Sequence, residues 1–113
     1  MKKTFLIACA LLIAATAFAA DTTVTGILMD KSCAKGDMGK QDPKTHDKGC
    51  NLMPDCVKSG YGVVTDDGKY LTFDAAGNKQ ATAWLKATKE KTNLKVTVTG
   101  AVEKDTIKVT SIK

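Results

Sequence analysis

Residues 62–73, GVVTDDGKYLTF, decide the fold that this sequence predicts. Two short runs rich in strand-forming residues, 62–65 and 69–73, flank the triplet Asp66-Asp67-Gly68. An Asp-Gly pair between two such runs is a strong signal for a tight β-hairpin turn. We therefore expect two neighbouring antiparallel strands here.

The segments on either side of this hairpin predict three further strands. Residues 22–29 alternate well enough to form a first strand, residues 94–99 alternate cleanly, and residues 106–112 form a last strand after a Lys104-Asp105 turn. Gly26 lies inside the first strand, where glycine indicates a bulge, a bend or a close approach of another backbone.

One helix is expected between the hairpin and the fourth strand. Residues 75–78 read as a break, and Asn78 is a good N-cap residue. Apolar positions then recur at helical spacing, which predicts an amphipathic helix over residues 79–90.

Five strands with a helix between the third and the fourth is the element order of the OB-fold, a small Greek-key barrel. We therefore predict a mainly β, five-stranded, OB-like barrel, with a small β-sandwich as the alternative. The strand residues expected to meet in its core are Val24, Leu28, Val63, Leu71, Phe73, Val96, Val98, Ile107 and Val109. Trp84 and Leu85 of the helix should cover one open end.

Residues 1–19 have the pattern of a secretory signal peptide. Lys2 and Lys3 precede an apolar run over residues 5–15, and Ala17-Phe18-Ala19 supplies a small-x-small cleavage site. No long apolar segment follows, so no membrane span is expected after signal removal. We expect a single soluble domain over residues 20–113, located in the periplasm or secreted.

The charge of the chain gives little reason to expect a nucleic-acid partner. The formal net charge is +5, but every basic residue is lysine and aromatic residues make up 5% of the chain. Proteins that read nucleic acids depend on bidentate arginine and on aromatic stacking. The excess of lysine is better explained by solubility.

The long connection between the first two strands, residues 30–60, holds the chemically distinctive side chains. Three cysteines and the single histidine lie in it: Cys33, His46, Cys50 and Cys56. Residues 30–49 show no sustained period, so we expect irregular structure that something must tie down. Pro54 should then begin a short helix over residues 54–59, which Gly60 ends.

A disulfide is the simplest tie for this insert. Cys33, Cys50 and Cys56 allow three single pairings, and an odd count leaves one thiol over in a monomer. A bridge from Cys33 to either later cysteine closes a loop of about 20 residues, worth about 3 kcal/mol by chain entropy. We therefore expect a non-enzymatic binding or structural module with a stapled insert. An unknown protein or small ligand should dock at the insert, because the loop after the first strand of an OB-fold borders its binding face.

Two other functions stay open. Cys33, His46, Cys50 and Cys56 together could bind zinc or copper, although their spacing is wider than in zinc knuckles. A thiol redox function would use Cys56, whose place at a helix N-terminus predicts a lowered pKa. The sequence contains no Cys-x-x-Cys pair, and with one histidine it gives no basis for a hydrolase triad, so we assign no catalytic residues.

Several motifs of the chain resemble a family of small, largely uncharacterised exported bacterial proteins. They are Val24-Thr25-Gly26-Ile27-x-x-Asp30-x-x-Cys33, Cys50, Cys56-Val57-Lys58-x-Gly60, Asp67-Gly68-Lys69-Tyr70-Leu71, Val96-Thr97-Val98-Thr99-Gly100 and Asp105-Thr106-Ile107-Lys108-Val109. The resemblance covers essentially all of the chain after the signal and implies an OB-like barrel. In that family the two later cysteines stand three residues apart, whereas here five residues, among them Pro54, separate them.

Overall fold

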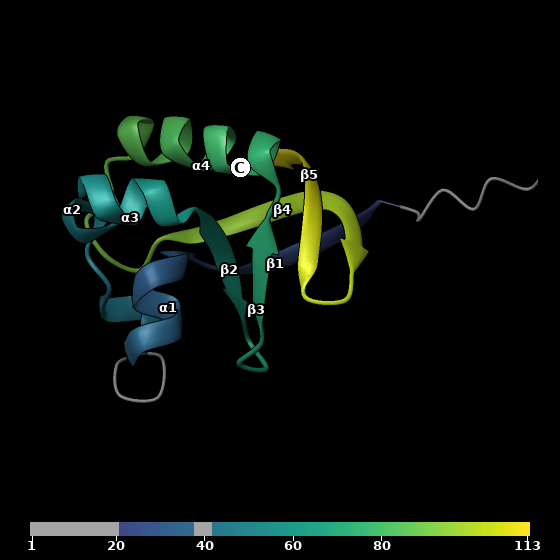
Figure 1. Cartoon of the computed structure of the whole chain (residues 1–113), viewed down its shortest axis with the longest axis horizontal. Coiled ribbons are helices and arrows are strands. Elements are labelled where there is room, and N and C mark those ends of the chain that lie inside the picture. Colours follow the sequence, from purple (N-terminus) through teal and green to yellow (C-terminus); the bar gives the residue numbers. More distant parts are fainter. Residues whose placement is uncertain (1–20, 38–41) are drawn as a thin grey trace, which may run out of the picture.

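The strands of this protein close into a barrel. The structure, a computed structural model, describes residues 21–37 and 42–113. Its strands are β1 (Thr22–Asp30), β2 (Tyr61–Thr65), β3 (Tyr70–Phe73), β4 (Lys95–Glu103) and β5 (Thr106–Ile112). They are hydrogen-bonded in the order β1-β2-β3-β5-β4, with β4 pairing back onto β1 (Figure 1). The predicted small, mainly β, OB-like barrel is confirmed.

The long strand β1 closes the barrel because it pairs antiparallel on both sides. Leu28 lies opposite Val63 of β2, and Val24 lies opposite Val98 of β4. Strand β3 meets β5 in parallel, and β4 passes through a register shift at Gly100 before pairing with β5. Every strand therefore has two hydrogen-bonded neighbours, which removes the unpaired edges of an open sheet.

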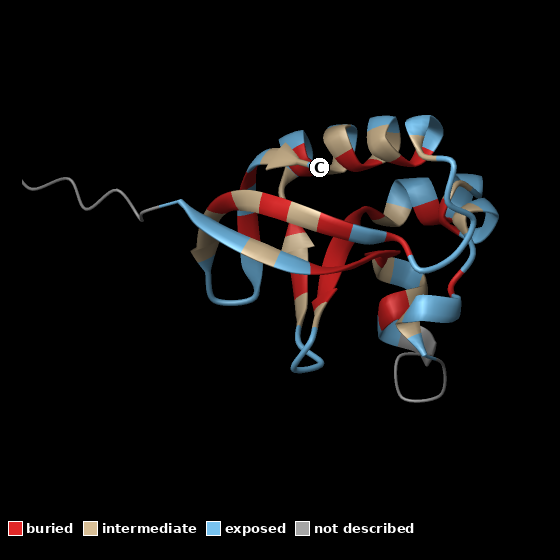
Figure 2. Cartoon of the chain, turned by 180° about the vertical axis from the view of Figure 1, so that it is seen from behind, coloured by how far each residue is buried: buried red, intermediate tan, exposed pale blue. Residues whose placement is uncertain are grey.

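The core fills this barrel as the alternation in the sequence predicts. Eight of the nine predicted core positions are buried in one cluster, and Val24 packs partly buried against it. The cluster also takes in Tyr61, Leu94 and two residues of the helix, Ala81 and Leu85. Figure 2 shows buried and partly buried positions alternating along β4, whereas β2 is buried along almost its whole length.

Helix α4 (Ala75–Ala87) covers the barrel between β3 and β4, but it begins and ends earlier than predicted. The prediction of a break at residues 75–78 is wrong because Asp74, not Asn78, caps the helix. The Asp74 carboxylate accepts hydrogen bonds from the backbone N–H of Gly77 at 3.0 Å and of Val109 at 3.1 Å. Asn78 serves another purpose, since its side-chain oxygen accepts from the N–H of Tyr61.

The prediction that residues 30–49 lack regular structure is also wrong. They contain α1 (Lys31–Asp37), the 3₁₀ helix η1 (Pro43–Thr45) and the start of α2 (Lys48–Asn51), after which α3 (Pro54–Ser59) forms as predicted. Asp30, Asp42 and Asp47 each accept a backbone N–H at the start of one of the first three helices. Helices α1, α2 and α3 gather at one end of the barrel (Figure 1).

The predicted signal peptide, residues 1–19, lies outside the described residues, as does Ala20. Among the residues that are described, none of the helices has both the length and the apolar character that crossing a membrane requires.

Candidate metal and thiol site

Asp30 is the centre of a polar cluster at the end of β1. Its side chain is fully buried and accepts a hydrogen bond from the backbone N–H of Cys33 at 2.9 Å, which caps α1. The other carboxylate oxygen lies 2.9 Å from Nε2 of His46. The N–H of Asp30 donates to the side-chain oxygen of Asn51, also at 2.9 Å. A buried carboxylate with this many partners holds β1, α1 and the rest of the insert together.

His46 reaches Asp30 because the chain on both sides of it is fixed to the β4 side of the molecule. The carbonyl of Lys44 accepts a hydrogen bond from the N–H of Asn93, and the N–H of Lys48 donates to the carbonyl of Lys91, both at 2.7 Å. His46 is itself 7% exposed. The imidazole is therefore positioned by backbone contacts as well as by its own bond to Asp30.

The three cysteines lie in different environments, and the structure has all of them as free thiols. Cys33 on α1 is half-buried, Cys56 on α3 is buried, and Cys50 on α2 is exposed. The thiols of Cys33 and Cys56 lie close to each other and to the carboxylate of Asp30. The disulfide expected from the sequence stays a prediction, and Cys33 with Cys56 is the pair that the fold brings into contact.

Burial and the neighbouring carboxylate keep these two thiols protonated. Burial, together with the charge of Asp30 and a hydrogen bond to it, raises the pKa of Cys33 to about 12. The same causes, burial first, raise the pKa of Cys56. The prediction of a lowered pKa for Cys56 is wrong, because the short helix α3 cannot offset burial and a buried negative charge.

The pKa of Asp30 moves in the opposite direction. Burial by itself would raise it, but hydrogen bonds from His46, from the Cys33 backbone and from the thiols of Cys56 and Cys33 outweigh burial. The pKa of Asp30 therefore lies below its ordinary value of 3.8. The cluster holds one carboxylate among several hydrogen-bond donors.

The same side chains form a group that could hold a metal ion. One ligand atom each from Asp30, Cys33 and His46 lies within 4.8 Å of the other two. We call these three residues the Asp–Cys–His group. Of the predicted ligand set, the structure brings Cys33 and His46 into this group and places Cys56 beside it. Cys50 lies outside the group, with its side chain exposed.

Asp30 is the site residue that the sequence-based ligand set missed. The set was drawn from cysteine and histidine alone, and acidic residues are common throughout the chain. The available signal was the spacing Asp30-x-x-Cys33, in which the acidic residue ends a strand and the cysteine lies three residues later. The same spacing separates a helix N-cap residue from the backbone N–H that it accepts. Asp30 is both the N-cap of α1 and a member of the Asp–Cys–His group.

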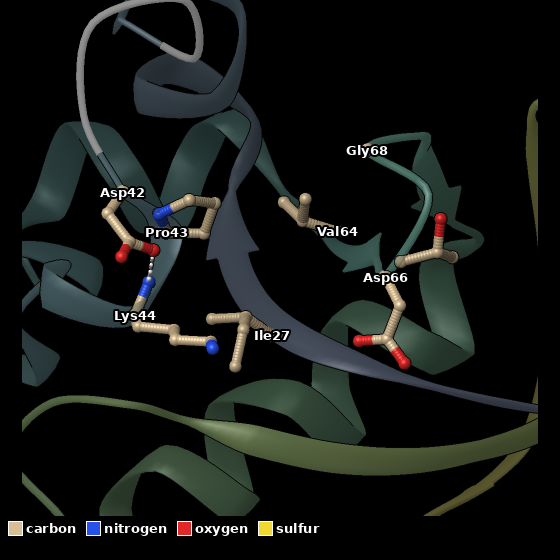
Figure 3. Close-up of a pocket in the computed structure, with 8 residues that line it drawn as sticks. Ile27, Asp42, Pro43, Lys44, Val64, Asp66 and Gly68 are labelled. Carbon is tan, nitrogen blue, oxygen red and sulfur yellow. Dashed lines mark hydrogen bonds between the residues drawn. The ribbon is translucent and has the colours of Figure 1, made fainter.

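A surface groove of about 260 Å³ lies next to the insert. Figure 3 shows Asp42, Pro43 and Lys44 on one side, Asp66 and Gly68 on the other, and Ile27 and Val64 between them. The groove therefore has an apolar floor and charged groups of both signs on its rim. It continues past Lys44 and Asp66 toward Asn93 and Lys95.

Comparisons with known proteins add no relative. No family model matches the chain, and neither a curated protein nor a solved structure is significantly similar to it.

Proposed function

We propose that this protein is a small exported metal-binding protein that holds zinc through the Asp–Cys–His group. The observation that carries the proposal is the convergence of a carboxylate, a thiol and an imidazole within 4.8 Å at a largely buried position. The three residues come from β1, α1 and the turn between η1 and α2. An ion bound here would join the barrel to the insert.

The donor atoms favour zinc over copper(I). Zinc in proteins is bound by cysteine sulfur, histidine nitrogen and carboxylate oxygen alike. Copper(I) prefers soft sulfur ligands, and a carboxylate is a hard donor. The presence of Asp30 in the group therefore changes the balance between the two metals that the sequence left open.

Cys56 is well placed to complete a tetrahedral set. Its thiol lies beside Asp30 and Cys33, two of the three proposed ligands. A fourth protein ligand gives zinc the closed coordination of structural sites, whereas three ligands and a water molecule are typical of catalytic ones. We propose the closed, structural arrangement, which agrees with a non-enzymatic role.

The thiol redox function has less support. A thiol attacks as its thiolate, and the buried carboxylate of Asp30 disfavours the thiolate of both Cys33 and Cys56. Cys50 is exposed but lies outside the polar cluster. A bound cation would favour the thiolates instead, because a metal ion displaces the proton of each thiol that binds it.

Zinc binding is tested by titrating the reduced protein against a chromogenic chelator. We expect one zinc ion per chain in the wild type and in Cys50→Ser, which is the matched control at an exposed cysteine. Cys33→Ser should bind at least about tenfold more weakly, because loss of even an outer-shell partner of a metal ligand costs about 10–100-fold and Cys33 is proposed as a ligand. Cobalt substitution should give a sulfur-to-metal charge-transfer band that is weaker in Cys33→Ser. Equal zinc affinity in the two variants would refute the proposal.

A second function, a binding module, is favoured by the groove beside the insert. Ile27 and Val64 offer an apolar floor, and Lys44 faces Asp66 across it (Figure 3). We propose that the groove suits a small zwitterionic ligand or a charged segment of a partner protein. Chemical-shift mapping with amino acids and short peptides tests this role. Shift changes confined to other surfaces would count against it.

A further inference from the structure

Cys33 is placed for two bonds that cannot exist together, a bond to zinc and a disulfide to Cys56. It supplies the sulfur of the Asp–Cys–His group, and its side chain also lies beside that of Cys56. Helices α1 and α3, which carry these two cysteines, pack against each other. Cysteine binds a metal ion as its thiolate, and a cysteine in a disulfide cannot form a thiolate.

We infer that zinc binding and a Cys33–Cys56 disulfide exclude each other, so that the protein holds its metal only while this pair is reduced. The inference rests on the proposed zinc function and adds its regulation. The two interpretations that the sequence left as rivals, a stapled insert and a metal site, then become two states of one protein.

The oxidation needs a thiol–disulfide exchange partner, RSSR. The Cys33 thiolate released from zinc attacks RSSR, forming a mixed disulfide and releasing RS⁻. The Cys56 thiolate, released from the same ion, then attacks the Cys33 sulfur, which forms the Cys33–Cys56 bond and releases a second RS⁻. The products are the protein disulfide, two RS⁻ and free Zn²⁺. Two electrons pass from the pair of cysteines to RSSR.

The burial of the two cysteines gives the order of these steps. Cys33 is half-buried and Cys56 is 8% exposed, so Cys33 is the sulfur that a dissolved reagent reaches first. Cys56 lies behind it as the resolving thiol. Cys50 is exposed on α2 and outside the cluster, so it can react with the reagent without affecting the metal.

The test uses Cys50→Ser, in which Cys33 and Cys56 are the cysteines left in the described part of the chain. The reduced full chain is loaded with zinc and titrated with oxidised glutathione, while a chromogenic chelator reports free zinc and intact mass reports disulfide formation. We expect zinc release to rise in proportion to the loss of two hydrogen atoms, with a peptide map joining Cys33 to Cys56. Excess zinc should raise the concentration of oxidised glutathione needed for half-oxidation by about tenfold, because coupling between two equilibria is reciprocal.

The matched control is Cys50→Ala, which should behave as Cys50→Ser does and shows that the serine hydroxyl has no part. Oxidation to the Cys33–Cys56 disulfide with zinc still bound would overturn the exclusion and leave the zinc function standing. Failure of the reduced protein to take up zinc would refute the zinc function itself, and the exclusion with it. Half-oxidation at the same concentration of oxidised glutathione with and without excess zinc would also overturn the exclusion.

Discussion

Removal of the Asp30 carboxylate should destabilise the protein even when no metal is present. Asp30→Ala deletes the N-cap of α1, since the N–H of Cys33 then has no side-chain acceptor. It also leaves Nε2 of His46 buried without its partner at 2.9 Å. A lost cap costs about 1 kcal/mol and an unsatisfied buried polar group about 1–3 kcal/mol. We therefore expect a loss of about 2–4 kcal/mol in the free energy of unfolding.

A loss of this size is large for a small domain. One kcal/mol shifts the melting temperature of a domain of 60–100 residues by about 4–8 °C, so Asp30→Ala should melt at least about 8 °C below the wild type. Asp30→Asn should lie between the two proteins. Its side-chain oxygen can still cap α1, and its amide can donate to Nε2 of a neutral His46.

Urea denaturation with a chelator present measures these differences without any contribution from metal. Asp47→Ala is the matched control, because Asp47 caps α2 from an exposed position and its carboxylate accepts from the N–H of Gly49, not from a buried histidine. That variant should lose the cap contribution alone, about 1 kcal/mol. If Asp30→Ala loses no more than Asp47→Ala, the buried carboxylate does not organise the insert and the reasoning fails.

Three further predictions concern the barrel. Burial raises the pKa of Tyr70 above its ordinary 10.0, so its stabilising contribution is complete below that pH and is lost as the pH rises further. Tyr70→Phe should therefore lose less stability than the wild type between about pH 9 and 11, measured by urea midpoints, and an equal loss would contradict this. Gly26→Ala should cost about 1–3 kcal/mol, because a Cβ there meets the carbonyl of Val64, and a melting temperature unchanged from the wild type would disprove the close approach. Leu85→Ala should cost about 2–5 kcal/mol while Lys86→Ala, on the exposed face of the same helix, changes stability little.

The barrel could be predicted from the sequence because its signals are local. The turn at Asp66-Asp67-Gly68 and the alternation in residues 94–99 each depend on residues that are close together along the chain. Gly68 has φ +83, the backbone conformation for which glycine is favoured at such a turn. Each strand segment also shows which of its faces is apolar, so the core followed from the same residues.

The start of α4 shows where local signals mislead. Both Asp74 and Asn78 are good caps by residue type, and the sequence does not say which one the fold employs. The N–H of Val109, which lies far along the chain, also donates a hydrogen bond to the Asp74 carboxylate. The side-chain oxygen of Asn78 accepts a hydrogen bond from the N–H of Tyr61 instead. Hydrogen-bond partners that are distant in the sequence therefore decide which of the two residues caps α4.

By itself the sequence determined the closed β-barrel and the identity of the side chains in its insert, because both depend on residue type and near-neighbour spacing. Only the tertiary structure decided which of those side chains meet. It brought Asp30, Cys33 and His46 together, placed Cys56 beside them and left Cys50 exposed. It also reversed the expected acidity of Cys56, since burial and a carboxylate from another element govern the pKa of a thiol more strongly than a short helix does.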